Sequence, residues 1–230
     1  MPPTLVGTNA AERLALVRAV IDTACAQARR PVGAVELIAI SKTQGVAAAQ
    51  AMIDAGQRHF GENRVQETQA KWSALRAKNP GVTLHHVGQL QSNKADAAVQ
   101  LFDVIHGLDR PSLVTALARA MDNTGRRLPC FIQVDLAGEP QKGGVSRAEL
   151  PSLLAQARLA QIDVIGLMAV PPVGLEPAPW FALLGKLGDD HGLAGLSMGM
   201  SADFATAIKI GATHVRVGTA LFGSRPATAP

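Results

Sequence analysis

Tyrosine is absent from the 230 residues, and the other aromatic residues are few. Cysteine is almost absent as well. Cys25 and Cys130 stand far apart in apolar surroundings, which is typical of buried thiols in a reducing compartment and excludes a disulfide framework. No uncharged apolar stretch reaches about 18 residues, and no basic start leads into a signal-type apolar core. These absences predict a soluble cytoplasmic protein without a membrane partner.

Clustered charge is also missing. The formal net charge is +4 and the isoelectric point is near 9.4, yet the basic residues are scattered over predicted helices. No run of lysine and arginine with interleaved aromatic residues occurs, so binding to nucleic acid is not expected.

Strand-like and helix-like segments alternate along the whole chain, and hydrophobic residues at 47 % are enough for a sizeable core. The predicted strands are 35–41, 58–62, 83–88, 104–109, 130–136, 163–170, 195–199 and 214–218. The predicted helices are 9–30, 46–55, 63–78, 93–101, 111–124, 147–160, 178–191 and 202–210. Such alternation indicates parallel pairing, and eight strands are the number that closes a (β/α)8 barrel.

The α/β fold expected from this pattern is a single TIM-type barrel over residues 1–224, with an extra N-terminal helix capped by Asn9 and a disordered tail at 225–230. A doubly wound open sheet is the alternative. It is disfavoured because no G-x-G-x-x-G motif follows the first strand. In a barrel of this kind, the functional residues gather where the strands end.

Lys42 ends the first strand in the string LIAISKTQ. One interpretation is a solvated charge at a strand end, because lysine is rarely buried without a partner. The other is a reactive amine that forms a Schiff base with a carbonyl compound. The residues alone leave both open.

The last two strand ends resemble a seat for a phosphate. In SMGMSADF, Ser201 offers a hydroxyl at a helix start, and in RVGTALFG the backbone N–H groups of Gly218 and Thr219 can meet an anion. Ordinary helix capping and tight packing are the alternative. Opposite such a seat, Lys42 is where a lysine bound to a phosphorylated aldehyde is expected.

Arg216 stands on the last strand between two valines, and a guanidinium inside a barrel needs a partner or a ligand. Next to a pyridine nitrogen, its charge would oppose protonation of that ring and favour holding a cofactor over carbanion chemistry. Successive strand residues face opposite sides, so only one of His85 and His86 faces the interior, and no metal site is expected. Glu62 and Asn63 could close a helix start or hold Lys42.

Several strings in order, LIAISKTQ, FGENRVQE, HHVGQLQSNK, IHGLDR, QVDLAGEPQKGGV and LSMGMSADFATAIKIGATHVRVGTALFG, resemble the pyridoxal phosphate homeostasis protein family. The resemblance runs from about residue 10 to 224. It implies the barrel of the alanine racemase N-terminal domain, without the second domain of the racemase. A monomer is therefore expected, because the usual dimer contact is missing.

The resemblance implies pyridoxal 5'-phosphate (PLP) as the cofactor. It matches Lys42 to the cofactor lysine and places Asn63 and His85 near the cofactor. The matches to the phosphate contacts and their surroundings are Met200, Ser201, Arg216, Gly218 and Thr219. Arg216 would touch either the phosphate or the ring nitrogen.

Three departures from the family pattern stand out. Asp135 replaces a frequent Asn and adds a possible carboxylate to the barrel, His86 replaces an aromatic residue, and the segment after the sixth strand is short and rich in proline.

The expected function is PLP homeostasis without robust catalysis, with an indirect influence on amino-acid and keto-acid balance and with PLP-accepting apo-enzymes as partners. An amino-acid racemase is the alternative. Racemases of this fold use a second base, usually a tyrosine from the partner subunit, and this chain has none. A third possibility is a phosphate-sugar or nucleotide-precursor enzyme with an acid/base pair drawn from Glu62, Asp109 and Asp135.

Overall fold

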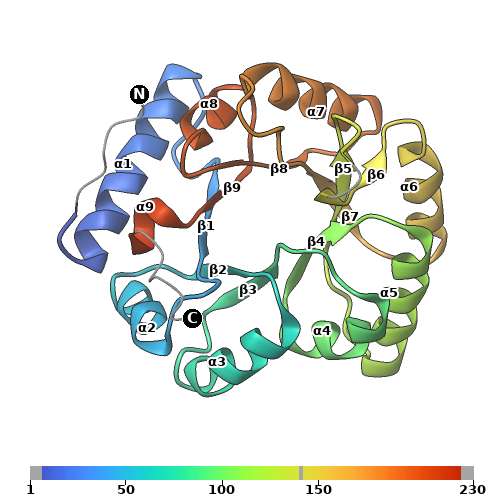
Figure 1. The fold of residues 1–230 in the computed structure, drawn as a ribbon, viewed down its shortest axis with the longest axis horizontal. Helices are drawn as coiled ribbons and strands as arrows, with labels where there is room; N and C mark the ends of the chain where they lie inside the picture. Colours follow the sequence, from blue (N-terminus) through green and yellow to red (C-terminus); the bar gives the residue numbers. More distant parts are fainter. Residues whose placement is uncertain (1–6, 140–141, 224–230) are drawn as a thin grey trace.

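In the computed structural model, which describes residues 7–139 and 142–223, parallel strands form a closed barrel with helices around it (Figure 1). The barrel strands of this part are β1 (Glu36–Ile40), β2 (His59–Glu62), β3 (Thr83–His86), β4 (Val104–Leu108), β5 (Cys130–Asp135), β7 (Val164–Met168), β8 (Gly195–Met200) and β9 (His214–Val217). They pair in that order, and β9 pairs with β1 to close the ring. The predicted barrel is confirmed, and an open sheet is excluded by this closure.

A ninth strand, β6 (Val145–Ser146), pairs with β5. It was not predicted, because two residues carry no periodic pattern. The helices are α1 (Ala10–Gln27), α2 (Val46–Asp54), α3 (Val65–Lys78), η1 (Ser92–Lys94, a 3₁₀ turn), α4 (Ala95–Leu101), α5 (Pro111–Thr124), α6 (Leu150–Leu159), α7 (Ala178–Asp190), α8 (Phe204–Lys209) and α9 (Thr219–Phe222).

The predicted extra helix at the N-terminus is α1, which packs against α8 and α9 outside the barrel (Figure 1). Its first turn is capped as expected, since the Glu12 N–H donates to Asn9 Oδ1 at 2.9 Å. The helix ends before the predicted residue 30, and Arg29 has a left-handed backbone with φ of 55°. Sequence periodicity alone did not mark this break.

Two layers of buried residues differ in character. Between the strands and the helices lies a continuous apolar core that includes Val17, Phe60, Trp72 and Leu117. The barrel interior is more polar, because buried histidine, serine and arginine side chains from several strands meet there. Glycine at position 61 of β2 makes room for the Ile40 side chain, since a Cβ there would lie 2.5 Å from Ile40 Cδ1 and would force that side chain to shift.

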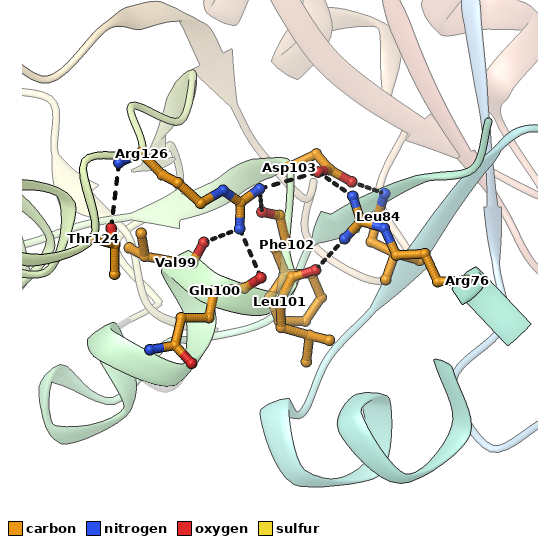
Figure 2. Close-up of polar contacts among 9 residues, drawn as sticks. All are labelled: Arg76, Leu84, Val99, Gln100, Leu101, Phe102, Asp103, Thr124 and Arg126. Atoms are coloured by element: carbon orange, nitrogen blue, oxygen red, sulfur yellow. Dashed lines mark hydrogen bonds and ion pairs between the residues drawn. The ribbon is translucent and has the colours of Figure 1, made fainter. Parts of the chain in front are cut away.

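Arg76 and Arg126 close the end of α4 at the side of the barrel where strands begin (Figure 2). Both guanidinium groups contact Asp103, at 2.6 and 3.4 Å, and the other Asp103 oxygen accepts the Leu84 N–H at 2.8 Å. The two arginines also donate to backbone carbonyls at the end of α4: Val99, Gln100, Leu101 and Phe102. These scattered basic residues therefore cap a helix C-terminus, where cations are favourable.

No helix within residues 7–139 and 142–223 has both the length and the apolar content needed to cross a membrane. The predicted tail, residues 225–230, lies outside the described residues.

Candidate functional site

Lys42 is half-buried just beyond the end of β1, at the barrel rim. A tight turn follows it, in which the Gln44 N–H donates to the Ser41 carbonyl at 3.0 Å. Thr43 inside this turn has φ of 65°, a left-handed conformation that costs a β-branched residue about 1–3 kcal/mol. Backbone strain of this size persists only where the surroundings hold the turn.

A buried ion pair supplies that support. The Glu62 carboxylate at the end of β2 accepts the Ser41 hydroxyl at 2.6 Å and the Trp72 indole N–H at 3.0 Å. Lys71 on α3 lies 2.5 Å from the same oxygen and also donates to the carbonyls of Ser41 and Gln44. Glu62 bonds Ser41 directly, and its partner Lys71 bonds the backbone on both sides of Lys42, so the pair holds the turn in place. The role of Lys71 was not predicted from the sequence.

A small cavity separates Lys42 from the rim of β9. Its volume is about 50 Å³, room for a few water-sized groups, and Ile40, Lys42, Gly218 and Thr219 are among its lining residues. The closure of the barrel through β1 and β9 brings these residues together from opposite ends of the chain. The predicted meeting of Lys42 with Gly218 and Thr219 is thus seen in the structure.

Ser201 belongs to the same rim but does not cap α8, which begins only at Phe204. Its hydroxyl oxygen accepts a hydrogen bond from the Gly218 N–H at 3.1 Å. This hydrogen bond connects the loop after β8 to the loop after β9. Met200, the last residue of β8, is 39 % exposed, and its N–H donates to Asp203 Oδ1 at 2.6 Å. Burial raises the pKa of the Asp203 carboxyl, while its backbone hydrogen bond and Arg216 oppose that shift.

Arg216 lies in the barrel interior and is almost fully buried. Its Nη1 donates to the carbonyl and hydroxyl of Ser197 at 2.6 and 2.7 Å, and its Nη2 donates to the Ala169 carbonyl at 2.9 Å. Burial lowers the pKa of the guanidinium to about 10, which still leaves it charged at neutral pH. Three of its five N–H donors are thereby engaged.

From Ser197, hydrogen bonds continue through the histidines of the interior. Ser197 Oγ lies 2.9 Å from His106 Nδ1, and His106 Nε2 lies 3.0 Å from His85 Nδ1. Strands β4 and β8 are not neighbours, so the bond between Ser197 and His106 crosses the interior. Arg216 can only donate, so Ser197 Oγ accepts from it; we assign the Ser197 proton to His106 Nδ1, and this assignment places the His106 proton on Nε2.

The same logic extends to the side of the barrel where strands begin. His85 accepts at Nδ1 and therefore carries its proton on Nε2, 3.1 Å from His59 Nδ1, and His59 Nε2 lies 3.4 Å from a Glu36 oxygen. Donors thus point in one direction, from the Arg216 cation toward the Glu36 carboxylate. The arrangement orients Arg216 through Ser197 and the buried rings of His106 and His85.

Burial keeps the imidazoles of His85, His106 and His214 neutral near pH 7. It lowers the pKa values of His85 and His106 well below their ordinary value and that of His214 to about 4. Phe131 stacks on His106, with 4.4 Å between ring centroids. Within the described part of the chain, no three histidine, cysteine or acidic side chains are placed to hold a metal ion.

Two residues predicted to lie near the cofactor, His85 and Asn63, are not among those that line the Lys42 cavity. His85 lies in the interior chain and reaches Arg216 only through His106 and Ser197. Asn63 lines a different cavity at the ends of β2 and β3.

Asp135 ends β5, and the carboxylate that it was expected to add to the barrel is bonded to its own turn, because its Oδ1 accepts the N–H groups of Ala137 and Gly138. A short polar side chain at a strand end often bonds its own turn in this way.

The missed residues had signals in the sequence. Lys71 lies three residues after Thr68 and four before Leu75, both buried, so helical spacing places it at the edge of the buried face of α3. Ser197 is the residue with a polar side chain in the alternating positions 195, 197 and 199, which lie on the same face of β8. Neither signal identifies the partner across the fold.

Known proteins resemble this chain in sequence, in fold or in both. The family model described as alanine racemase, N-terminal domain, matches residues 18–226. The pyridoxal phosphate homeostasis protein of Aquifex aeolicus (strain VF5) is 37 % identical over 227 residues, covering 94 % of this chain and 99 % of that protein. The chain belongs to the pyridoxal phosphate homeostasis protein family. The family predicted from the sequence motifs is therefore confirmed.

Two solved structures extend the comparison. PipY of Synechococcus elongatus PCC7942, solved with PLP bound, is 41 % identical, covers 93 % of this chain and 100 % of its own, and has a TM-score of 0.79. The alanine racemase of Bartonella henselae with covalently bound pyridoxal phosphate is 19 % identical, with a TM-score of 0.67, over 91 % of this chain and 60 % of the racemase. This second likeness shows the shared barrel fold.

Proposed function

We propose that this chain binds PLP at the rim between β1 and β9 and acts in PLP homeostasis, with the cofactor held as a Schiff base on Lys42. The observation that carries the proposal is the small cavity that Lys42 lines together with Gly218 and Thr219. The relative PipY, solved with PLP bound, supports it. When bound, PLP supplies an aldehyde that condenses with a primary amine.

The residues present suit such a group. Ser201 offers its hydroxyl proton and Thr219 its backbone N–H to a phosphate, while the Gly218 N–H, already donated to Ser201 Oγ, holds the two loops together. Lys42 stands on a turn fastened by the Glu62 and Lys71 pair, so its amine has a defined position. Strain at a functional turn of this kind preorganises the group that it carries.

The charge of Arg216 favours binding of the cofactor without catalytic turnover. Three of its N–H donors are already bound by Ser197 and Ala169, which leaves Nε and one Nη2 proton for a ligand. Its charge persists at neutral pH, and a cation beside a ring nitrogen disfavours protonation of the ring. This supports a role without robust catalysis, since an unprotonated pyridine withdraws electrons weakly.

The expected consequence is a carrier role, in which the protein passes PLP to apo-enzymes and thereby influences amino-acid and keto-acid pools. The test uses a PLP-free aminotransferase and an added amine that traps free PLP. In its presence, the loaded protein should restore transaminase activity faster than an equal amount of free PLP. Equal rates would contradict directed transfer.

The acid/base alternative receives no support from the geometry. Glu62 is committed to Lys71, Asp109 lies 2.5 Å from Arg110, and Asp135 bonds its own turn. The three carboxylates thus have separate partners.

The decisive experiment is reconstitution with PLP. We expect an absorbance band above about 400 nm, typical of cofactor imines, and borohydride reduction should fix the label on the peptide that contains Lys42. Lys42→Ala should lose the band and the label, while Lys186→Ala, an exposed lysine on α7, should keep both. A label elsewhere would refute the proposal.

Incubation with single L-amino acids and chiral analysis separates a carrier, which gives no D-product, from a racemase.

A further inference from the structure

A second and larger cavity, of about 400 Å³, lies at the rim between the ends of β2 and β3. Its lining includes Arg64, His86 and Lys94, together with the amide side chains of Gln89 and Gln91. None of the residues that line the Lys42 cavity takes part in it. The two spaces are therefore separate, and this volume lies in the range of small-molecule sites.

The cavity is cationic. Lys94 is half-buried, and its ammonium has no ion-pair or hydrogen-bond partner among residues 7–139 and 142–223. Arg64 is exposed and pairs with Glu67 at 2.9 Å, and no carboxylate belongs to the described lining. The first turn of α3, a helix of 14 residues, borders the same space and turns the positive end of its dipole toward it.

His86 adds an unsatisfied acceptor. It is 1 % exposed, and its Nδ1 is a buried atom without a hydrogen-bond partner in the described chain. Burial lowers the pKa of this imidazole to about 4, so it is neutral near pH 7, and the ring bonds the backbone of Asn63. The proton therefore sits on Nε2, and Nδ1 presents a lone pair. A buried acceptor of this kind calls for a donor.

We propose that this cavity binds a small molecule that carries an oxyanion and, beside it, an O–H or N–H donor. The oxyanion, a carboxylate or a phosphate, meets Lys94 and the first turn of α3. The donor meets His86 Nδ1, and the amide groups of Gln89 and Gln91 recognise the remaining polar atoms. The site is independent of the function proposed for Lys42, because the two cavities share no lining residue.

Calorimetric titration tests this assignment with three probes. Inorganic phosphate and L-serine carry an oxyanion together with a donor, whereas acetate carries the oxyanion alone. Saturable binding is expected for phosphate, L-serine or both, and the one that binds identifies the class of oxyanion. Binding of neither probe, or binding of acetate as tight as theirs, overturns the proposal.

Variants locate the binding. Lys94→Met should weaken it about tenfold, and His86→Phe about fivefold, since each removes one polar partner of the ligand. Lys186→Met is the matched control, because this exposed lysine pairs with Asp190 on α7 and should leave binding unchanged. If Lys94→Met fails to fold, Lys94→Gln removes the same charge with a polar side chain.

Ser201→Ala separates this cavity from the rim near Lys42. Phosphate binding that persists in Ser201→Ala and falls in Lys94→Met supports the proposal. Binding that is lost in Ser201→Ala and unchanged in Lys94→Met overturns it, and it also leaves the PLP proposal standing, so the two failures are distinguishable.

Discussion

Acidification is expected to destabilise the protein through its buried histidines, and His86 allows the effect to be isolated. The folded protein lowers the pKa of His86 from 6.5 to about 4 by burial. Above pH 6.5 both folded and unfolded states are neutral there, and the full stability is present. As the pH falls below 6.5, the unfolded chain takes up a proton that the folded state excludes, so the free energy of unfolding falls.

The size of the effect follows from the shift. Each pH unit between the two pKa values costs about 1.4 kcal/mol, so acidification from pH 6.5 to about pH 5 removes about 2 kcal/mol for His86 alone. His214, with its pKa also lowered to about 4, acts in the same direction, as do His85 and His106. The whole protein should therefore lose several kcal/mol over this window.

Urea denaturation near pH 7 and near pH 5 measures the difference in the free energy of unfolding. In His86→Phe this difference should be smaller than in the unmodified protein by about 2 kcal/mol, because one titrating group is gone. Phe102→Leu is the control. It removes the ring that packs edge-on against His86, 5.0 Å between centroids, and should lower stability equally at both pH values. An unchanged pH dependence in His86→Phe would refute the reasoning.

Three further predictions concern buried polar contacts of the barrel. Lys71→Met should lower the free energy of unfolding by about 3–5 kcal/mol in urea, because it leaves the buried Glu62 charge unpaired, and adding Glu62→Gln should recover most of this loss. Asp103→Ala should cost about 1–2 kcal/mol in the same assay and leave the PLP band intact, because it unpairs the Leu84 N–H far from the rim. Ser197→Ala should cost about 1–2 kcal/mol, and the ¹⁵N resonances of His106 should show loss of the pure Nε2–H form. A protein as stable as the unmodified one would contradict each of the three.

Much of the barrel was predictable because its signals are local. Short apolar runs alternating with helical periodicity specify parallel strands, and the eight predicted strands all occur. Polar residues at strand ends, such as Lys42 and Ser201, were predictable as a group, since parallel strands in a barrel end on one side. The two-residue β6 and the four-residue α9 were missed because elements so short carry little periodic information.

The sequence by itself determined the fold class, the family and the rim on which Lys42 lies, because these follow from periodicity and from motifs contiguous in the chain. Only the tertiary structure decided which polar groups meet. It pairs Glu62 with Lys71, and it connects Arg216 to His106 by hydrogen bonds through Ser197. It also places Asn63 in the lining of a second cavity. Barrel closure brings distant strands within hydrogen-bond reach, and burial then requires each polar group to find a partner.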